Sequence, residues 1–165
     1  MLMIIFIDTS AWVKFFINEQ GTDHIQRFMI EQSRSEENVF AASAVTCAEM
    51  TATFRRAWKG QRIIEEEYEE ILKEFREQLT IFTIAQVNGN LITLSGNLAE
   101  TYALKGCDAF QLASALSLQT DVFVSCDEEL NDAAEKCGLY VWNPVGGELP
   151  LFNLTEDCKN RDSQN

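Results

Sequence analysis

The chain is organised around one short stretch, residues 105–115, with the sequence KGCDAFQLASA. Asp108 lies where the first turn of a helix is expected, shortly after Gly106. Leu112 and Ala115 follow it at i+4 and i+7, the spacing of a stripe that holds one helix face against a core. Because a carboxylate at a helix N-terminus is favoured by the helix dipole, capping explains Asp108 when it is considered alone. The positions of the other isolated acids point to a further role.

Length, composition and charge narrow the class of protein. The 165 residues, 46% of them hydrophobic, are enough for one domain with a sizeable core. We expect this domain to span residues 1–154 and a polar, disordered tail to follow at 155–165. The formal net charge of −13 argues against non-specific binding of nucleic acid or anionic membrane by the whole surface. It leaves room for a local basic patch or a bound cation.

The cysteines and the first residues indicate a cytoplasmic protein that does not associate with a membrane. Five cysteines is an odd number and no C-x-x-C pair is present, so we expect buried, reduced thiols. Residues 2–7 are apolar but too few to span a membrane. They lack the basic flank of a signal peptide, and Asp8 ends the run.

Apolar runs alternate with helical patterns along the chain. The runs at residues 2–7, 39–42, 80–85, 121–125 and 139–142 predict five strands. Segments between them, including 43–59, 61–78, 88–104 and 106–118, carry hydrophobic residues at helical spacing. Ser10 is the expected N-cap of the first helix. This alternation predicts a parallel sheet with helices on both faces, and ligands bind such sheets outside the carboxyl ends of the strands.

Four acids are expected at that edge of the sheet. Asp8 follows the first strand and Asp127 follows the fourth. Glu49 lies about two turns into the helix after the second strand, and Asp108 lies early in its own helix. Carboxylates this close repel one another, and a divalent cation relieves the repulsion. Oxygen ligands suit Mg²⁺ or Mn²⁺, which can activate water for phosphodiester hydrolysis.

Each acid also has a simpler explanation. Asp8 is a plausible turn residue before a helix, and Glu49 could be an ion-paired acid at a helix edge. Asp127 is a plausible helix cap. None of these explanations predicts that all four acids gather at one end of the sheet.

The stretches that carry these acids resemble a known family. They are IDTSA at 7–11, AEM at 48–50, CDAFQLASAL at 107–116 and FVSCDEEL at 123–130. Their order and spacing resemble the PIN domain, in particular the toxin ribonucleases of VapBC toxin–antitoxin systems, over residues 2 to about 143. The resemblance implies a three-layer α/β/α sandwich with a five-stranded parallel sheet. It also implies that Asp8, Glu49, Asp108 and Asp127 bind Mg²⁺ or Mn²⁺ in an endoribonuclease that cuts single-stranded RNA.

The resemblance has further implications for the site and for partners. A hydroxyl of Thr9 or Ser10 would assist at the metal, although Ser10 could simply cap its helix. A homodimer is implied, together with a small antitoxin whose basic tail could enter the acidic site. A PIN-like module that binds RNA or protein without catalysis remains the alternative, because the fold does not by itself establish activity.

Residues that could bind the substrate are less clearly marked. On a helix, Arg56 returns to within about 20° of the Glu49 face two turns on, which makes it a candidate phosphate contact. The alternative is a solvated helix end with i,i+4 pairing. Lys14, six residues after Asp8, is a second candidate.

Two other folds that place acids at the end of a parallel sheet fit poorly. A phosphoacceptor receiver domain needs an acid directly after the third strand, where this chain has Ile84, Ala85 and Gln86. A phosphatase of the haloacid dehalogenase type needs Asp-x-Asp after the first strand, where this chain has Asp8, Thr9 and Ser10.

Overall fold

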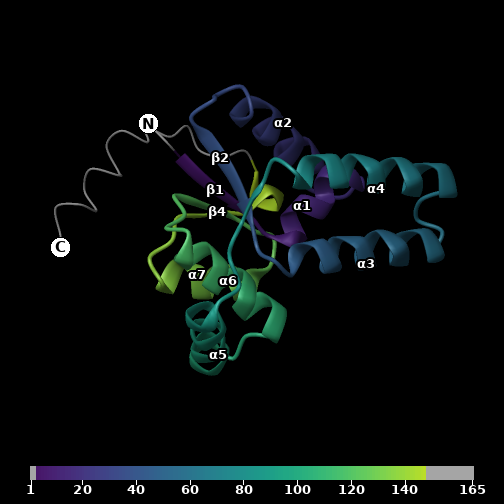
Figure 1. Ribbon diagram of the computed structural model, residues 1–165. Helices are drawn as coiled ribbons and strands as arrows, with labels where there is room; N and C mark the ends of the chain where they lie inside the picture. Colours follow the sequence, from purple (N-terminus) through teal and green to yellow (C-terminus); the bar gives the residue numbers. More distant parts are fainter. Residues whose placement is uncertain (1–2, 148–165) are drawn as a thin grey trace.

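Five parallel strands form the centre of the protein in the order β3-β2-β1-β4-β5 (Figure 1). They are β1 (Met3–Ile7), β2 (Asn38–Ala42), β3 (Thr83–Ile84), β4 (Val122–Val124) and β5 (Val141–Trp142). This computed structural model describes residues 3–147, so the predicted domain boundary at 154 and the tail at 155–165 lie outside the described residues. The predicted five-stranded parallel sheet is confirmed, although β3 and β5 are shorter than the apolar runs that predicted them.

The central strand β1 explains why its sequence is a continuous apolar run. Its neighbours are β2 on one side, where Ile5 lies opposite Phe40, and β4 on the other, where Ile5 lies opposite Val122. Ile5 and Ile7 join one hydrophobic core, whereas Phe6 points into a second core on the opposite face. A strand covered on both faces has no polar side, so hydrophobic residues do not alternate with polar ones.

Helices cover both faces of the sheet and complete three layers (Figure 1). One face carries α1 (Thr9–Phe16), α2 (Thr22–Gln32), α3 (Thr46–Lys59) and α4 (Glu65–Leu79), and the other carries α5 (Gly89–Tyr102), α6 (Gly106–Ser117) and α7 (Glu128–Lys136). A short 3-10 turn, η1 (Pro144–Gly146), follows β5. Trp12 anchors the first face, with its ring stacked on Phe82 at 3.9 Å and meeting Phe75 edge-on at 5.3 Å. The predicted α/β/α sandwich is confirmed.

Two helices begin a few residues later than their hydrophobic patterns indicated. α3 begins at Thr46, because the Ser43 carbonyl accepts a turn hydrogen bond from the Thr46 N–H and the turn precedes the helix. α4 begins at Glu65, and Glu67 reaches back to accept a hydrogen bond from the Ile64 N–H at 2.9 Å. As a result, Glu49 lies in the first turn of α3 and not two turns into it.

α3 and α4 lie side by side and extend away from the sheet (Figure 1). Trp58 and Tyr68 stack between them at 4.9 Å, and the Arg55 guanidinium lies 4.1 Å from the centre of the Trp58 ring. Within residues 3–147, no helix is both long enough and apolar enough to cross a membrane.

The cysteines correct one expectation. The four in the described part of the chain are free thiols, but Cys47 and Cys107 are exposed and Cys126 and Cys137 are only partly buried. Cys47 and Cys107 lie in the first turns of α3 and α6, where the helix begins at the rim of the sheet. The prediction that these thiols are buried was therefore wrong.

Candidate active site

Asp8 joins the end of β1 to the start of α1. Its side chain is 4% exposed, and its Oδ2 accepts hydrogen bonds from the Ser10 N–H at 3.0 Å, the Ser10 hydroxyl at 2.5 Å and the Ser125 hydroxyl at 3.2 Å. Asp8 is thus the N-cap of α1, and the prediction that Ser10 is the cap was wrong. Both residues are good caps. Because β1 ends at Ile7, Asp8 is the first residue after the strand and takes the cap position.

Burial and hydrogen bonding act on Asp8 in opposite directions. Removal from water raises the pKa of the carboxyl, the hydrogen bonds from Ser10 and Ser125 lower it, and the charge of Glu49 raises it again. The balance is a pKa of about 6. At neutral pH the carboxylate is therefore ionised, although burial disfavours its charge. A nearby positive charge would stabilise it.

Glu49 is held by groups from two other elements. Its Oε2 accepts a hydrogen bond from the Thr9 hydroxyl at 3.0 Å and another from the side-chain amide of Gln111 at 2.8 Å. The two predicted supporting hydroxyls are thus divided, with Thr9 bound to Glu49 and Ser10 bound to Asp8. Gln111 was not predicted as part of the site.

Asp108 lies in the first turn of α6, but the capping explanation for it is wrong. Lys105 occupies the N-cap position, and Asp108 is the third residue of the helix. Its side chain is half-buried, and burial raises its pKa first. The negative charges of Asp127, Glu49 and Glu129 raise the pKa further, against the opposing charge of Lys105. Asp108 therefore lies within the electrostatic reach of two of the predicted acids.

Asp127 caps α7 and faces the same edge. Its Oδ1 accepts a hydrogen bond from the Leu130 N–H at 2.9 Å, so the expected capping role is confirmed. The same carboxylate contributes to the raised pKa of Asp108. Capping and membership of the acidic cluster are thus compatible for this residue.

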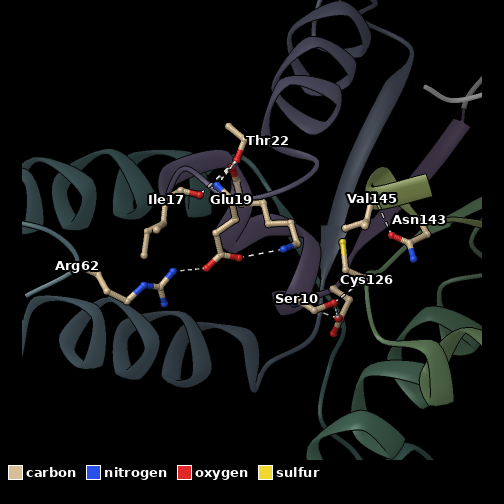
Figure 2. Close-up of polar contacts among 10 residues, drawn as sticks. Ser10, Ile17, Glu19, Thr22, Arg62, Cys126, Asn143 and Val145 are labelled. Carbon is tan, nitrogen blue, oxygen red and sulfur yellow. Dashed lines mark hydrogen bonds and ion pairs between the residues drawn. The ribbon is translucent and has the colours of Figure 1, made fainter. Parts of the chain in front are cut away.

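Ser125 hydrogen-bonds to both Asp8 and Asp127, and it was also not predicted from the sequence. Its buried hydroxyl donates to Asp8 and accepts the Asp127 N–H at 3.2 Å. The Ser10 hydroxyl lies 3.2 Å away and accepts the Cys126 N–H at 2.9 Å, and Ser10 and Cys126 are adjacent in Figure 2. Burial raises the pKa of the Cys126 thiol to about 11, so it is protonated at neutral pH and unsuited to act as a nucleophile.

The four acids come from four separate segments and interact through their charges. Glu49 affects both Asp8 and Asp108, and Asp127 affects Asp108. Among residues 3–147, no three Asp, Glu, His or Cys side chains form a group that could hold a metal ion as they stand. The donor set nevertheless fits Mg²⁺ or Mn²⁺, because such ions bind through one or two carboxylates and otherwise keep water or substrate oxygens as ligands.

The two predicted substrate contacts have different surroundings. Arg56 is exposed, and its Nη2 donates to the Thr53 hydroxyl at 2.9 Å, which in turn donates to the Glu49 carbonyl at 2.8 Å. The Arg56 guanidinium therefore lies toward the Glu49 end of α3. Lys14 forms an ion pair with Glu19 at 2.9 Å, so a phosphate would compete with that carboxylate.

Glu19 also binds Arg62, which follows α3 (Figure 2). Partial burial alone would raise the pKa of Glu19, but the hydrogen bonds from Lys14 and Arg62 outweigh it and the pKa is lowered. Glu19 thus ties the loop between α1 and α2 to the connection between α3 and α4.

The sequence matches one family over most of its length. The model of the PIN domain matches residues 5–136, a range that contains all four acids. The chain belongs to the PIN domain family. This PIN domain is 28% identical over 142 residues to Ribonuclease VapC46 of Mycobacterium tuberculosis, in an alignment that covers 85% of the chain and 97% of the relative.

Solved structures share the fold of this PIN domain at low sequence identity. VapBC2 from Rickettsia felis, bound to a DNA fragment from its promoter, matches with a TM-score of 0.62 and 17% identity over 86% of this chain and 98% of the other. VapC20 of M. tuberculosis, a toxin that cleaves the sarcin–ricin loop, matches with a TM-score of 0.57 and 16% identity over 78% of this chain and 94% of the other.

Proposed function

We propose that this PIN domain is an endoribonuclease that hydrolyses phosphodiester bonds of single-stranded RNA with Mg²⁺ or Mn²⁺, and that it is the toxin of a toxin–antitoxin pair. The observation that carries the proposal is the electrostatic coupling of Asp8, Glu49, Asp108 and Asp127 across four segments of the chain. A raised pKa at two of these carboxyls is typical of sites built to hold a cation or move a proton. The names of the matched relatives, a ribonuclease and an RNA-cleaving toxin, support the same reaction.

The four carboxylates are proposed to have different roles at this site. Asp8, Asp108 and Asp127 are proposed to hold the ion directly or through water, and Glu49 to complete the cluster or to orient the attacking water. A bound divalent cation supplies a lowered pKa for water and positive charge for the scissile phosphate. Ser10 and Ser125 hold Asp8 by one oxygen before any ligand arrives, so little reorganisation is needed during the reaction.

The path of the RNA is proposed to follow α3 away from the acids. Thr53, the acceptor of the Arg56 hydrogen bond, lies four residues after Glu49, a rise of about 6 Å along the helix. Arg56 at that distance is suited to bind a phosphate next to the scissile one, because a guanidinium binds phosphate oxygens in pairs. Contacts of this kind position a nucleic acid strand without reading its bases.

The proposed partners follow from charge and from the relatives. A protein with a net charge of −13 and an acidic rim favours a basic segment as inhibitor, and several similar structures are toxin–antitoxin complexes. We therefore propose an antitoxin with a basic tail, a homodimeric toxin and action in the cytoplasm.

The test of the proposed reaction is cleavage of labelled single-stranded RNA by the purified chain. Cleavage is expected with Mg²⁺ or Mn²⁺ and not with a chelator, and Asp8→Asn is expected to be inactive. Asp132→Asn, which neutralises an exposed acid of α7, is the matched control and is expected to cleave normally. Equal cleavage by the wild type and Asp8→Asn would overturn the assignment. Mn²⁺ binding without cleavage of any RNA would favour the non-catalytic module.

The proposed RNA path along α3 is tested with a substitution of Arg56 in the same cleavage assay. Arg56→Ala is expected to raise KM and to leave kcat nearly unchanged, because the lost contact is made equally before and during the reaction. Lys136→Ala removes an exposed cation at the far end of α7 and serves as the charge-matched control. An unchanged KM for Arg56→Ala would remove α3 from the proposed path.

A further inference from the structure

We propose that Gln111 is a positioning residue that fixes the Glu49 carboxylate relative to Asp108. The inference deepens the proposed function, because it assigns a role at the same site to a residue that the acids alone do not reveal. It rests on hydrogen-bond geometry and burial.

The side chain of Gln111 connects three elements of the fold. It lies on α6 with no exposed surface, and its Nε2 is 2.8 Å from Glu49 Oε2, 3.0 Å from the Thr9 hydroxyl and 3.1 Å from the Thr46 hydroxyl. Thr9 begins α1, and Thr46 and Glu49 lie in the first turn of α3. One amide therefore joins the starts of two helices to the body of a third.

Gln111 and Thr9 act together on the same atom. Thr9 donates its hydroxyl proton to Glu49 Oε2 and accepts a hydrogen bond from Gln111, which also donates to Oε2. The carboxylate is thus held by one oxygen through two donors, and Oε1 takes no part in this contact. Hydrogen bonds to a charged acceptor are stronger than neutral ones, so this pair of donors holds Oε2 of the carboxylate in place.

Gln111 lies on the same helix as Asp108, so its contact with Glu49 also affects how Glu49 and Asp108 are spaced. Asp108 lies three residues earlier on the same helix, close to one full turn, and its half-buried carboxyl feels the charge of Glu49. The Gln111–Glu49 hydrogen bond therefore sets the spacing between two carboxylates that repel each other. Partners that orient metal-binding side chains in this way commonly change metal affinity or activity by about 10–100-fold when they are removed.

The test compares two buried positions of one helix in the full-length protein. Gln111→Met keeps the length of the side chain and removes the amide, whereas Ser114→Ala removes a buried hydroxyl one turn later that binds Ser43 at 3.0 Å. Mn²⁺ binding is measured by electron paramagnetic resonance of the free ion, and RNA cleavage gives kcat and KM. Gln111→Met is expected to weaken Mn²⁺ binding about 10–100-fold and to lower kcat with little change in KM. Ser114→Ala is expected to lower Tm without changing Mn²⁺ affinity.

Two results would overturn the role of Gln111. If Gln111→Met lowers Tm as Ser114→Ala does but binds Mn²⁺ within about twofold of the wild type, the residue is structural only. If the wild type itself binds no Mn²⁺, the proposed function fails together with this inference. Gln111→Asn, which keeps the amide but is one methylene shorter, is the second variant in case Gln111→Met does not fold. It is expected to weaken Mn²⁺ binding in the same direction, and wild-type affinity in Gln111→Asn would contradict the proposal.

Discussion

Asp8 and Asp108 perform the same proposed task in opposite surroundings. Asp8 is buried and held by three hydrogen bonds from two serines, whereas Asp108 is half-buried at the start of a helix, near three acids and one lysine. Hydrogen bonds fix one end of the site, and repulsion that a cation would relieve shapes the other. Substitutions at the two ends should therefore affect activity alike and stability differently.

The largest expected effect is the shared one, on activity. Asp8→Asn and Asp108→Asn should each reduce metal-dependent RNA cleavage by a factor on the order of 10²–10³, because each removes a charge that is proposed to act at the reacting centre. Single-turnover cleavage rates in Mg²⁺, with Asp132→Asn as control, provide the measurement. A variant with more than a tenth of the wild-type rate would show that its carboxylate is dispensable.

The pH dependence of stability should separate the two ends next. The pKa of Asp8 is about 6 in the folded protein against 3.8 in the unfolded chain, so the folded state binds this proton more tightly. The carboxyl is protonated in both states below pH 4 and costs nothing there, and stability falls as the pH rises from 4 to 6. Above pH 6 the full penalty is present, about 3 kcal/mol for a shift of this size.

Asp8→Asn removes this titration and keeps an acceptor for the helix cap. In chelator, the variant should therefore exceed the wild type in Tm most at pH 7.5 and least at pH 5. Mn²⁺ should reverse the order at pH 7.5 by stabilising the wild type. A constant difference across this pH range would contradict the raised pKa of Asp8.

Ser125→Ala should have an intermediate effect, confined to the hydrogen-bonded end. It removes one donor to Asp8, in a buried hydrogen bond, and the acceptor of the Asp127 N–H, in a partly buried one. A loss of about 1–3 kcal/mol in the free energy of unfolding is expected from urea denaturation. Thr93→Ala, at an exposed position of α5, is a suitable control and should change it by less than about 0.5 kcal/mol. Equal effects of the two substitutions would show that the Ser125 contacts contribute little.

The smallest expected effect is that of Asp108→Asn on the metal-free protein. The substitution removes repulsion and no cap, so the free energy of unfolding should change by less than about 1 kcal/mol, toward greater stability. Thermal unfolding in chelator measures it. A large loss of stability would restore a structural role for this acid.

The sequence predicted the features that depend on local patterns. Continuous apolar runs identified the strands, and the acids after the first and fourth runs, Asp8 and Asp127, were expected at the rim. It failed where two residues competed for one local role. Asp8 and Ser10 are both suitable caps two positions apart, and only the observed end of β1 decides between them.

Gln111 and Ser125 could not be predicted because their partners are distant in sequence. Gln111 binds Glu49 across 62 positions, and Ser125 binds Asp8 across 117. Each is a polar residue beside apolar ones, a pattern that does not show whether the side chain is exposed or buried and paired. The available signal was weak: Gln111 lies one turn after Asp108 on the same helix, in line with the proposed site.

The double role of Asp8, as cap of α1 and as proposed ligand, has a consequence for genetics. Asparagine can replace the cap but cannot supply the charge, and aspartate codons become asparagine codons by a single G-to-A transition. On the proposed toxin function, cells selected for survival of its expression should therefore often carry Asp8→Asn, a change that removes the proposed activity and keeps the protein folded. Such survivors would still accumulate a folded protein able to bind and titrate the proposed antitoxin.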